Sequence, residues 1–152
     1  MFKPTLGIIG GGQLGSLLAS AAKDLDVRTV IFSDDIDAPG KHFCDEFIFG
    51  NYIDELKIKE FCYKVDIITF EFENIPFKTL EYLNNHKKVL PKPKINKVIQ
   101  NRLNEKDFIN KCNLRTTSYN YIDRLDRIKT SSDLIPGLLK TCTLGYDGKG
   151  QY

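Results

Sequence analysis

The sequence predicts an α/β protein whose first part is a Rossmann-like domain built on a parallel sheet. Continuous apolar runs alternate with helix-like segments through the first ninety residues, which is typical of a parallel sheet covered on both faces. A glycine-rich loop at residues 10–15 follows the first run and opens a helix. The proline pair Pro91-Lys-Pro93 then marks the best boundary in the chain. We therefore expect one domain at residues 1–93 and a different unit at residues 94–152.

Five strands are predicted in the first domain, at residues 5–9, 27–32, 46–49, 65–70 and 88–90. Helices are predicted at residues 13–23, at residues 53–63 and after Pro76, which suits a first helical turn. In the first helix, one face carries the apolar residues Leu14, Leu17, Leu18, Ala21, Ala22 and Leu25. The second helix is expected to turn Ile53, Leu56 and Phe61 inward, and the third carries Leu80 and Leu83.

The second unit is expected to open with a helix that Asn96 caps and that runs to about residue 112. Its inward residues would be Val98, Ile99, Leu103 and Ile109. Strands are predicted at residues 119–122 and 137–141, with a short helical turn capped by Ser131 or Ser132 between them. Residues 144–152 look like a hairpin loop with no partner strand after it. The second unit is therefore expected to be the incomplete start of a domain.

Composition excludes several classes of function. The 152 residues carry 22 basic and 20 acidic side chains that are scattered along the chain, so the net charge of +2 does not predict a nucleic-acid binder. No apolar run approaches the roughly 20 residues that a membrane-spanning helix needs. The N-terminus runs straight into a strand pattern without a cleavage-like site, which predicts a cytoplasmic protein.

The loop Gly10-Gly-Gly-Gln-Leu-Gly15 has three possible interpretations. Glycines let the backbone turn tightly, and a helix N-terminus offers unpaired N–H groups to an anion. The loop could therefore bind a dinucleotide, with Asp34 or Asp35 at the end of the second strand contacting the ribose. It could instead hold a monophosphate. In the third interpretation the glycines only permit close packing of the helix on the strand.

Two acids follow the fourth strand in Thr69-Phe-Glu-Phe-Glu-Asn-Ile-Pro76. Glu71 and Glu73 alternate with phenylalanines, so both carboxylates can project to the same side. Ligands of open parallel sheets bind beyond the carboxyl ends of the strands, on the edge where the glycine loop also lies. Two acids there favour a ligand with hydroxyls or an amine. Alternatively, the acids stabilise the N-terminus of the following helix.

A second glycine-rich loop occupies residues 145–151. Its backbone N–H groups could close over phosphates, which Lys149 could neutralise. Lys140 stands next to apolar Leu138 and Leu139 on the preceding predicted strand, where a buried lysine is costly unless it meets an anion. Arg102, early in its helix, could reach the same anion. Alternatively, both cationic side chains are simply solvated.

Taken together, the motifs resemble one family. The loop at residues 10–15, Thr69–Pro76, Gln100-Asn-Arg-Leu-Asn-Glu-Lys106, and Leu139-Lys-Thr141 followed by Gly145-Tyr-Asp-Gly-Lys-Gly-Gln151 occur in the order found in the 5-(carboxyamino)imidazole ribonucleotide synthases. These enzymes are ATP-grasp carbon–nitrogen ligases of purine biosynthesis. The resemblance covers the whole chain, and four motifs in order are specific. It implies that the first domain is the pre-ATP-grasp domain and that residues 94–152 begin the ATP-grasp domain.

The resemblance implies an activity and a set of small-molecule partners. ATP and bicarbonate would give carboxyphosphate, which carboxylates the exocyclic amine of 5-aminoimidazole ribonucleotide on the route to IMP. Four residues are implied to contact that substrate: Gly12, Gln13, Leu14 and Glu73. ATP is implied to bind Arg102, Lys140 and the second loop, which consists of Gly145, Tyr146, Asp147, Gly148, Lys149, Gly150 and Gln151. Asp147 and Lys149 are implied to approach the reacting centre as catalytic residues.

The resemblance also implies features beyond this chain. Family members are more than twice as long, so we expect the magnesium ligands in the missing C-terminal part and none among these residues. We expect no turnover by the chain alone, and a homodimer for the full-length protein.

Two other classes of function remain open from the sequence. A nicotinamide-dependent dehydrogenase would use the first loop but has no need of Lys140 and the second loop. A non-catalytic nucleotide-binding remnant would use either loop without chemistry. A related ATP-grasp ligase, such as the formate-dependent glycinamide ribonucleotide transformylase, would keep the ATP loop and change the small substrate. The Glu-Phe-Glu-Asn stretch and the pair Tyr146-Asp147 favour the carboxylating family.

Overall fold

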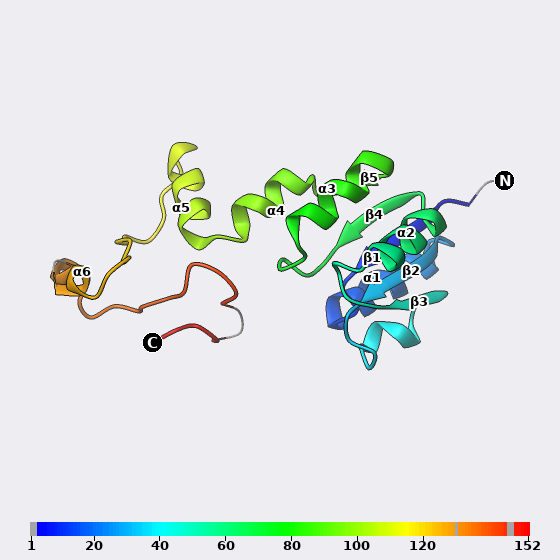
Figure 1. Cartoon of the computed structure of the whole chain (residues 1–152), viewed down its shortest axis with the longest axis horizontal. Helices are drawn as coiled ribbons and strands as arrows, with labels where there is room; N and C mark the ends of the chain where they lie inside the picture. The colour runs from blue at the N-terminus through cyan, green and yellow to red at the C-terminus, as the bar shows by residue number, and fades with distance from the viewer. Residues whose placement is uncertain (1–2, 130, 146–147) are drawn as a thin grey trace. The chain divides into compact units, whose positions relative to one another are not determined.

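The computed structural model describes residues 3–129, 131–145 and 148–152. The chain divides into two compact units, Met1–Asn96 and Lys97–Tyr152, which we call unit 1 and unit 2 (Figure 1). No helix among the described residues combines the length and the apolar character needed to span a bilayer.

Unit 1 is built on a five-stranded sheet in which every pair of neighbouring strands is parallel. The spatial order is β3-β2-β1-β4-β5, so the order reverses at the β1–β4 pair. The predicted α/β class and parallel sheet are confirmed. The strands are β1 Thr5–Ile9, β2 Arg28–Ser33, β3 Glu46–Phe49, β4 Ile67–Phe70 and β5 Lys88–Val89.

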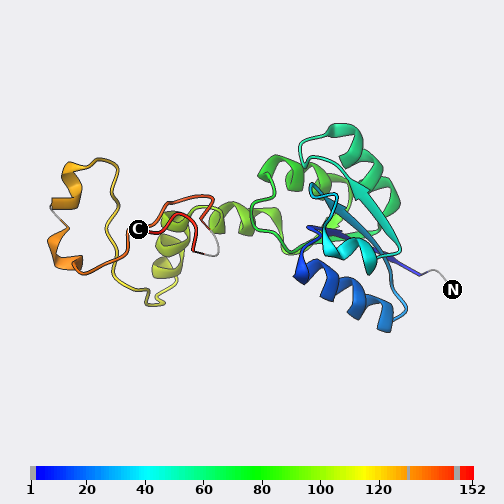
Figure 2. The same ribbon diagram turned by 90° about the horizontal axis from the view of Figure 1, so that it is seen from below.

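Helices cover both faces of this sheet. The helix α1 (Gln13–Asp24) and the short 3-10 helix η1 (Pro39–His42) lie on one face. The helices α2 (Glu55–Lys64) and α3 (Phe77–His86) pack on the other face. Figure 2 shows α1 and α2 on opposite sides of the strands. Asp54 caps α2 by accepting hydrogen bonds from the N–H groups of Leu56 and Lys57, and this fixes where the helix begins.

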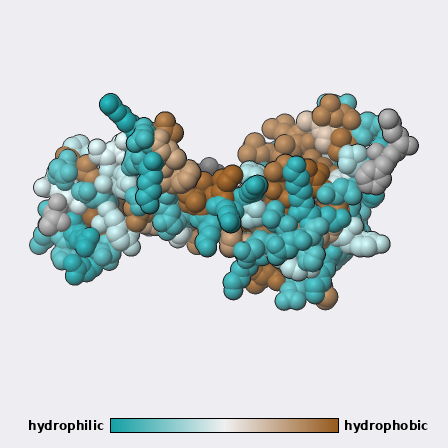
Figure 3. Space-filling view, turned by 90° about the horizontal axis from the view of Figure 1, so that it is seen from above, coloured by the Kyte–Doolittle hydropathy of each residue, from teal (hydrophilic) through white to brown (hydrophobic). Residues whose placement is uncertain are grey.

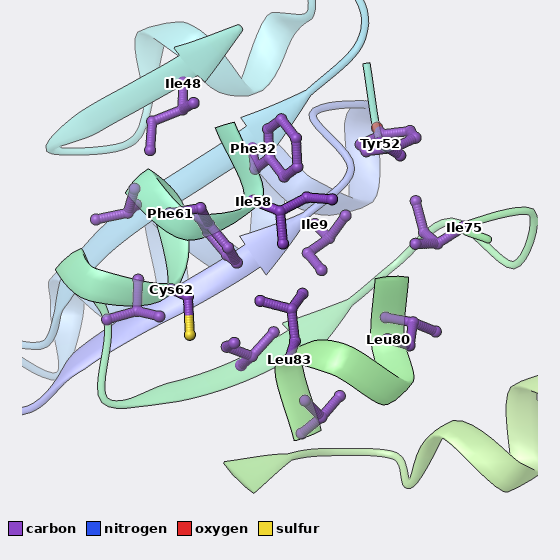
Figure 4. Packing of buried hydrophobic residues seen from close by; sticks show 14 residues of the cluster. Ile9, Phe32, Ile48, Tyr52, Ile58, Phe61, Cys62, Ile75, Leu80 and Leu83 are labelled. Carbon is purple, nitrogen blue, oxygen red and sulfur yellow. The ribbon is translucent and has the colours of Figure 1, made fainter. Parts of the chain in front are cut away.

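The larger core lies between the sheet and the pair α2 and α3 (Figure 4). In this core the ring of Phe32 packs against two other rings. Its centroid lies 5.4 Å from that of Tyr52, which is edge-on, and 5.6 Å from that of Phe61. Each fully buried side chain of this size contributes about 1.5–3 kcal/mol to folding. Leu80 and Leu83, which the sequence places on the third helix, are fully buried in the same cluster.

Of the apolar face predicted for α1, only Ala22 is buried. Leu14, Leu17, Leu18 and Leu25 are between 39% and 78% exposed. The buried side consists of small residues, namely Gly15, Ser16, Ala19 and Ala22. The physical reason is close approach, because a Cβ on Gly15 would lie 2.5 Å from the carbonyl oxygen of Gly10. Figure 3 shows hydrophobic surface exposed on unit 1.

The prediction of which α2 residues face inward is wrong at two of three positions. Phe61 is fully buried, but Ile53 and Leu56 are 67% and 78% exposed. Because Asp54 caps the helix, Ile53 precedes it and Leu56 lies in its first turn. Burial in α2 instead falls on Ile58, Phe61 and Cys62.

The single long helix predicted from Asn96 is in fact two helices, α4 (Pro93–Ile99) and α5 (Arg102–Lys111). Asn96 is not a cap; it is fully buried and donates from Nδ2 to the carbonyl oxygen of Ile75 at 3.4 Å. The cap is Asn101, whose side chain accepts from the N–H groups of Leu103 and Asn104. The residues predicted to face inward, Val98, Ile99, Leu103 and Ile109, are at most partly buried.

The remainder of unit 2 contains little regular structure among its described residues. The helix α6 spans Asp126–Lys129 and the 3-10 helix η2 spans Ser132–Leu134, the latter where a helical turn was predicted. The strand predicted at residues 119–122 is irregular chain. The strand predicted at residues 137–141 is reduced to a bridge between Lys140 and Gln151.

A matched pair of substitutions tests which face of α1 is buried. Ala19→Leu adds volume against Ile8 and Ile31, so we expect it to lower the free energy of unfolding by about 1–3 kcal/mol. Leu17→Ala removes a side chain that is 64% exposed, and we expect a loss within about 0.5 kcal/mol. Urea unfolding followed by circular dichroism measures both. A larger loss for Leu17→Ala than for Ala19→Leu would show that the leucine face is the packed one.

Candidate functional site

The register of β1 against β4 positions the candidate site of unit 1. Ile9 pairs with Phe70, the last residues of their strands, and the N–H of Glu71 donates to the carbonyl oxygen of Ile9 at 3.1 Å. Gly10 and Glu71 therefore leave the sheet side by side. They do so at the carboxyl ends of the two strands where the spatial order reverses, which is the usual ligand position in open parallel sheets.

The side chain of Glu71 lies across the first glycine loop. Its Oε1 accepts a hydrogen bond from the N–H of Gly12 at 3.1 Å. A Cβ built on Gly10 would lie 2.6 Å from the same oxygen, and Gly10 has a φ of 103° that favours glycine. Glu71 was expected either to meet a ligand or to stabilise the helix that follows it. It instead contacts the N-terminal end of α1.

Other groups of unit 1 hold the same loop. The N–H of Gly40, in η1, donates to the carbonyl oxygen of Gly11 at 2.8 Å. The hydroxyl of Ser16 donates to the carbonyl oxygen of Gly12 at 2.9 Å. The three glycines are thus explained by contacts within the chain, which favours the close-packing interpretation of the motif. Sequence reasoning missed Ser16 and η1; the hydroxyl four residues after Gly12 was the available signal for Ser16.

The electrostatics around Glu71 disfavour its charged form. Partial burial is the largest cause that raises the pKa of this carboxyl, and the nearby carboxylate of Glu73 raises it further. The hydrogen bond from Gly12 acts in the opposite direction. The two acids are therefore close enough to interact, as their alternation predicted. Glu73 is half-buried and accepts a hydrogen bond from Nδ2 of Asn74 at 3.4 Å.

The residues predicted to bind the ribonucleotide all lie at this end of unit 1. Gly12 is the N-cap of α1, and Gln13 and Leu14 are its first, exposed residues. Glu73 follows β4 by three residues. The structure brings Gly12 into contact with Glu71, a residue outside the predicted set. The ligand-binding roles of the predicted residues stay predictions.

Asp34 and Asp35, the two acids considered as ligands of a dinucleotide ribose, interact with other residues of the chain. Burial raises the pKa of Tyr52 to about 12, and the neighbouring carboxylate of Asp34 contributes to the shift. Asp35 uses Oδ1 to accept the N–H of Asp37 at 2.9 Å, which closes the loop after β2. Asp34 thus lies beside a buried phenol, and Asp35 shapes its own loop.

Arg102 is the centre of the candidate site in unit 2. Asn101 caps α5, so Arg102 is the first residue of that helix. The N–H of Arg102 donates to the carbonyl oxygen of Cys142 at 2.8 Å, and Nη2 donates to the carbonyl oxygen of Gly145 at 3.4 Å. Its Nε is buried and has no hydrogen-bond partner among the residues that the structure describes. An anion could satisfy that donor.

The second glycine loop closes on itself. Leu139 and Tyr152 exchange two backbone hydrogen bonds of 3.0 and 2.9 Å, and the N–H of Thr141 donates to the carbonyl oxygen of Gly150 at 2.9 Å. Residues 150–152, at the end of the predicted hairpin loop, therefore pair with the end of the strand predicted at residues 137–141. Lys140 was expected on a buried strand, but it is exposed, because the bridged ribbon has no layer packed over Leu138 and Leu139 in the described part of unit 2.

Thr141 shapes the loop and was missed by sequence reasoning. A Cβ on Gly150 would lie 2.3 Å from its Oγ1, and one on Gly145 would lie 2.9 Å away. Gly148 and Gly150 have φ values of 81° and 68°, so the backbone turns at both. Lys149 lies between them. Two predicted residues, Tyr146 and Asp147, lie outside the described residues. The described residues contain no group of three or more His, Cys, Asp or Glu side chains that could hold a metal ion.

The chain is similar to known proteins of purine synthesis. Residues 3–100 match the family model of the ribonucleotide synthetase preATP-grasp domain. The chain is 38% identical over 97% of its length to the bifunctional purine synthesis protein purC/E of Dictyostelium discoideum, covering 15% of that protein. It is 36% identical over 97% of its length to the N5-carboxyaminoimidazole ribonucleotide synthase of Brucella melitensis, covering 41% of it. It therefore spans less than half the length of both relatives.

A solved structure shows the same likeness. The chain superposes on the N5-carboxyaminoimidazole synthetase of Staphylococcus aureus, complexed with ADP, with a TM-score of 0.91 and 32% sequence identity. The match covers 99% of this chain and 41% of that one.

The raised pKa of Glu71 predicts how Glu71→Gln changes stability with pH. The folded chain holds the proton of Glu71 more tightly than the unfolded chain, so ionisation costs stability as the pH rises from about 4 to 7. Glutamine carries no charge and escapes that cost. We expect the melting temperature of Glu71→Gln minus that of the wild type to rise over this interval. The exposed Glu81→Gln is the control, and a flat or falling difference for Glu71→Gln would contradict the assignment.

Two glycine substitutions test the closure of the second loop. Gly148→Ala and Gly150→Ala both place alanine at a positive φ, which costs about 1–2 kcal/mol. Only Gly150→Ala also collides with Thr141, since no described atom lies within 4 Å of a Cβ on Gly148. We expect hydrogen exchange at the N–H of Thr141 and Tyr152 to accelerate at least tenfold more in Gly150→Ala. Equal exchange in the two variants would refute the contact.

Proposed function

This chain belongs to the ribonucleotide synthetase preATP-grasp family, and from that membership we propose that it is part of an ATP-grasp carbon–nitrogen ligase. The reaction is the ATP-dependent carboxylation of 5-aminoimidazole ribonucleotide with bicarbonate. Bicarbonate first attacks the γ-phosphate of ATP to give carboxyphosphate and ADP, and the exocyclic amine then attacks the carboxyl carbon, loses a proton and releases phosphate. The product is the N-carboxyamino ribonucleotide of purine biosynthesis. The names of the Brucella and Staphylococcus relatives, which share 36% and 32% identity with the chain, support this assignment.

In this proposal the two parts of the chain bind different ligands. Residues 1–93 bind the ribonucleotide, and residues 94–152 begin the ATP-grasp domain. Gly12, Gln13 and Leu14 lie at the start of α1, where Gln13 and Leu14 are exposed and Gln13 offers a side-chain amide. Glu73, next to Glu71 at the end of β4, supplies a carboxylate that accepts hydrogen bonds from ribose hydroxyls or from the substrate amine.

The observation that carries the nucleotide part of the proposal is the buried Nε of Arg102. This donor lacks a partner within the described residues, while its guanidinium also contacts the glycine loop at Gly145. A phosphate oxygen would satisfy the donor and tie it to the loop. Residues of the closed loop that would surround the phosphates are Gly145, Tyr146, Asp147, Gly148, Lys149, Gly150 and Gln151. Lys140, exposed beside Gln151, adds a positive charge.

ATP supplies the phosphoryl group that activates bicarbonate, and this chain's own residues position and neutralise the reacting anions. Asp147 and Lys149 approach the reacting centre in this assignment. Magnesium accompanies ATP in phosphoryl transfer, but the described residues do not offer a metal-binding cluster, so no step here depends on a metal held by them. We further propose that the enzyme acts in the cytoplasm as a homodimer.

Titrations of the isotope-labelled chain test both binding assignments. We expect ATP to shift the amide resonances of Arg102 and residues 148–151, and 5-aminoimidazole ribonucleotide to shift those of Gln13, Leu14 and Glu73. Arg102→Ala should weaken ATP binding about tenfold, as expected for one charge-assisted contact. The matched control Arg124→Ala removes an exposed arginine of the same unit and should leave ATP binding unchanged.

Two results would contradict the proposed function. One is saturable binding of a nicotinamide dinucleotide at residues 10–15 with no response to the aminoimidazole ribonucleotide. The other is ATP binding that Arg102→Ala and Arg124→Ala weaken equally.

A further inference from the structure

Glu71 fills the concave side of the first glycine loop. Its side chain lies near the positions that a Cβ would take on all three motif glycines. Its Oε1 lies 2.6 Å from that position on Gly10 and 3.3 Å from that on Gly12, and its Cγ lies 3.7 Å from that on Gly15. The glycines therefore make room for a side chain of the protein itself.

The carboxylate of Glu71 accepts a hydrogen bond from the N–H of Gly12, a donor that a phosphate-binding loop would direct at its ligand. In such loops the N–H groups at the start of the helix point at the phosphate, and the helix dipole adds to the attraction. In this chain the N–H of Gly12 donates to Oε1 of Glu71 at 3.1 Å. An incoming phosphate would have to displace one anion and would meet the charge of a second, Glu73, close by.

We propose that Glu71 is a specificity-determining residue that excludes phosphate groups from the first glycine loop. Its carboxylate takes the place of the anion at the N-terminus of α1. The loop is thereby closed to the pyrophosphate of a dinucleotide and to a monophosphate, although its sequence fits the motif for both. The carboxylates of Glu71 and Glu73 favour binding of a ligand group that donates hydrogen bonds, such as a hydroxyl or an amine.

The exclusion of phosphate does not depend on the proposed function, but the identity of the donor group rests on it. If the ligand is an aminoimidazole ribonucleotide, its ribose hydroxyls or its amine face this loop and its phosphate lies away from the N-terminus of α1. Glu71 acts here by positioning the loop and by its charge.

Inorganic sulfate is a suitable probe because it mimics a phosphate dianion and stays ionised at neutral pH. The wild-type chain, Glu71→Gln and the control Glu81→Gln are titrated at constant ionic strength, and the amide resonances of Gly12, Gln13 and Leu14 are followed. Glutamine keeps an oxygen acceptor for the N–H of Gly12 but removes the charge. We expect sulfate to bind Glu71→Gln at least tenfold more tightly than it binds the other two chains.

Equal affinity in the three chains, or no measurable binding in any of them, would overturn the proposal. If Glu71→Gln does not fold, Glu71→Met provides an uncharged side chain of similar length, and the same two outcomes apply. The probe is neither ATP nor the ribonucleotide. A failure here therefore leaves the proposed function standing, and a failure of the ligand titrations leaves the exclusion of phosphate standing.

Discussion

The pairing of Ile9 with Phe70 is the constraint on which the site of unit 1 depends. It brings two loops that are sixty residues apart in sequence to one edge of the sheet. Because the residues after the pair are Gly10 and Glu71, a carboxylate lies directly on the glycine loop. The positive φ of Gly10, the hydrogen bond at Gly12 and the close approach of α1 at Gly15 all accompany that placement.

The two glycine loops of the chain are built in different ways. The first is held by a buried sheet, and its N–H at Gly12 is already bound by a carboxylate. The second is held by a short bridged ribbon around Thr141, and beside it Arg102 keeps a buried donor without a partner among the described residues. The charges beside the two loops also differ, because the acidic Glu71 contacts the first loop and the cationic Arg102 contacts the second. This difference suits a ligand donor group at one loop and phosphates at the other.

Sequence patterns predicted the sheet of unit 1 well, because its strands β1 and β2 are largely apolar runs that are mostly buried. They failed where packing geometry decides. The leucines of α1 look like a core face, yet Gly15 and Ala19 let the helix lie so close to the sheet that only small residues fit beneath it. The motif at residues 10–15 left both anion binding and close packing open, because the sequence does not show which strand neighbours β1. In unit 2 the predicted residue Arg102 does lie at the second loop, but the bridge between Lys140 and Gln151 depends on tertiary pairing that no local pattern indicates.

The amide proton of Gly12 reports directly on the contact between Glu71 and Gly12. Its chemical shift can be followed in the wild-type chain from pH 3 to pH 8. We predict one clear inflection, at a pH above the ordinary pKa of a glutamate, where Glu71 ionises, because its carboxylate accepts the hydrogen bond from this N–H. A Gly12 resonance that does not change with pH, or that changes at the ordinary glutamate pKa, would contradict it.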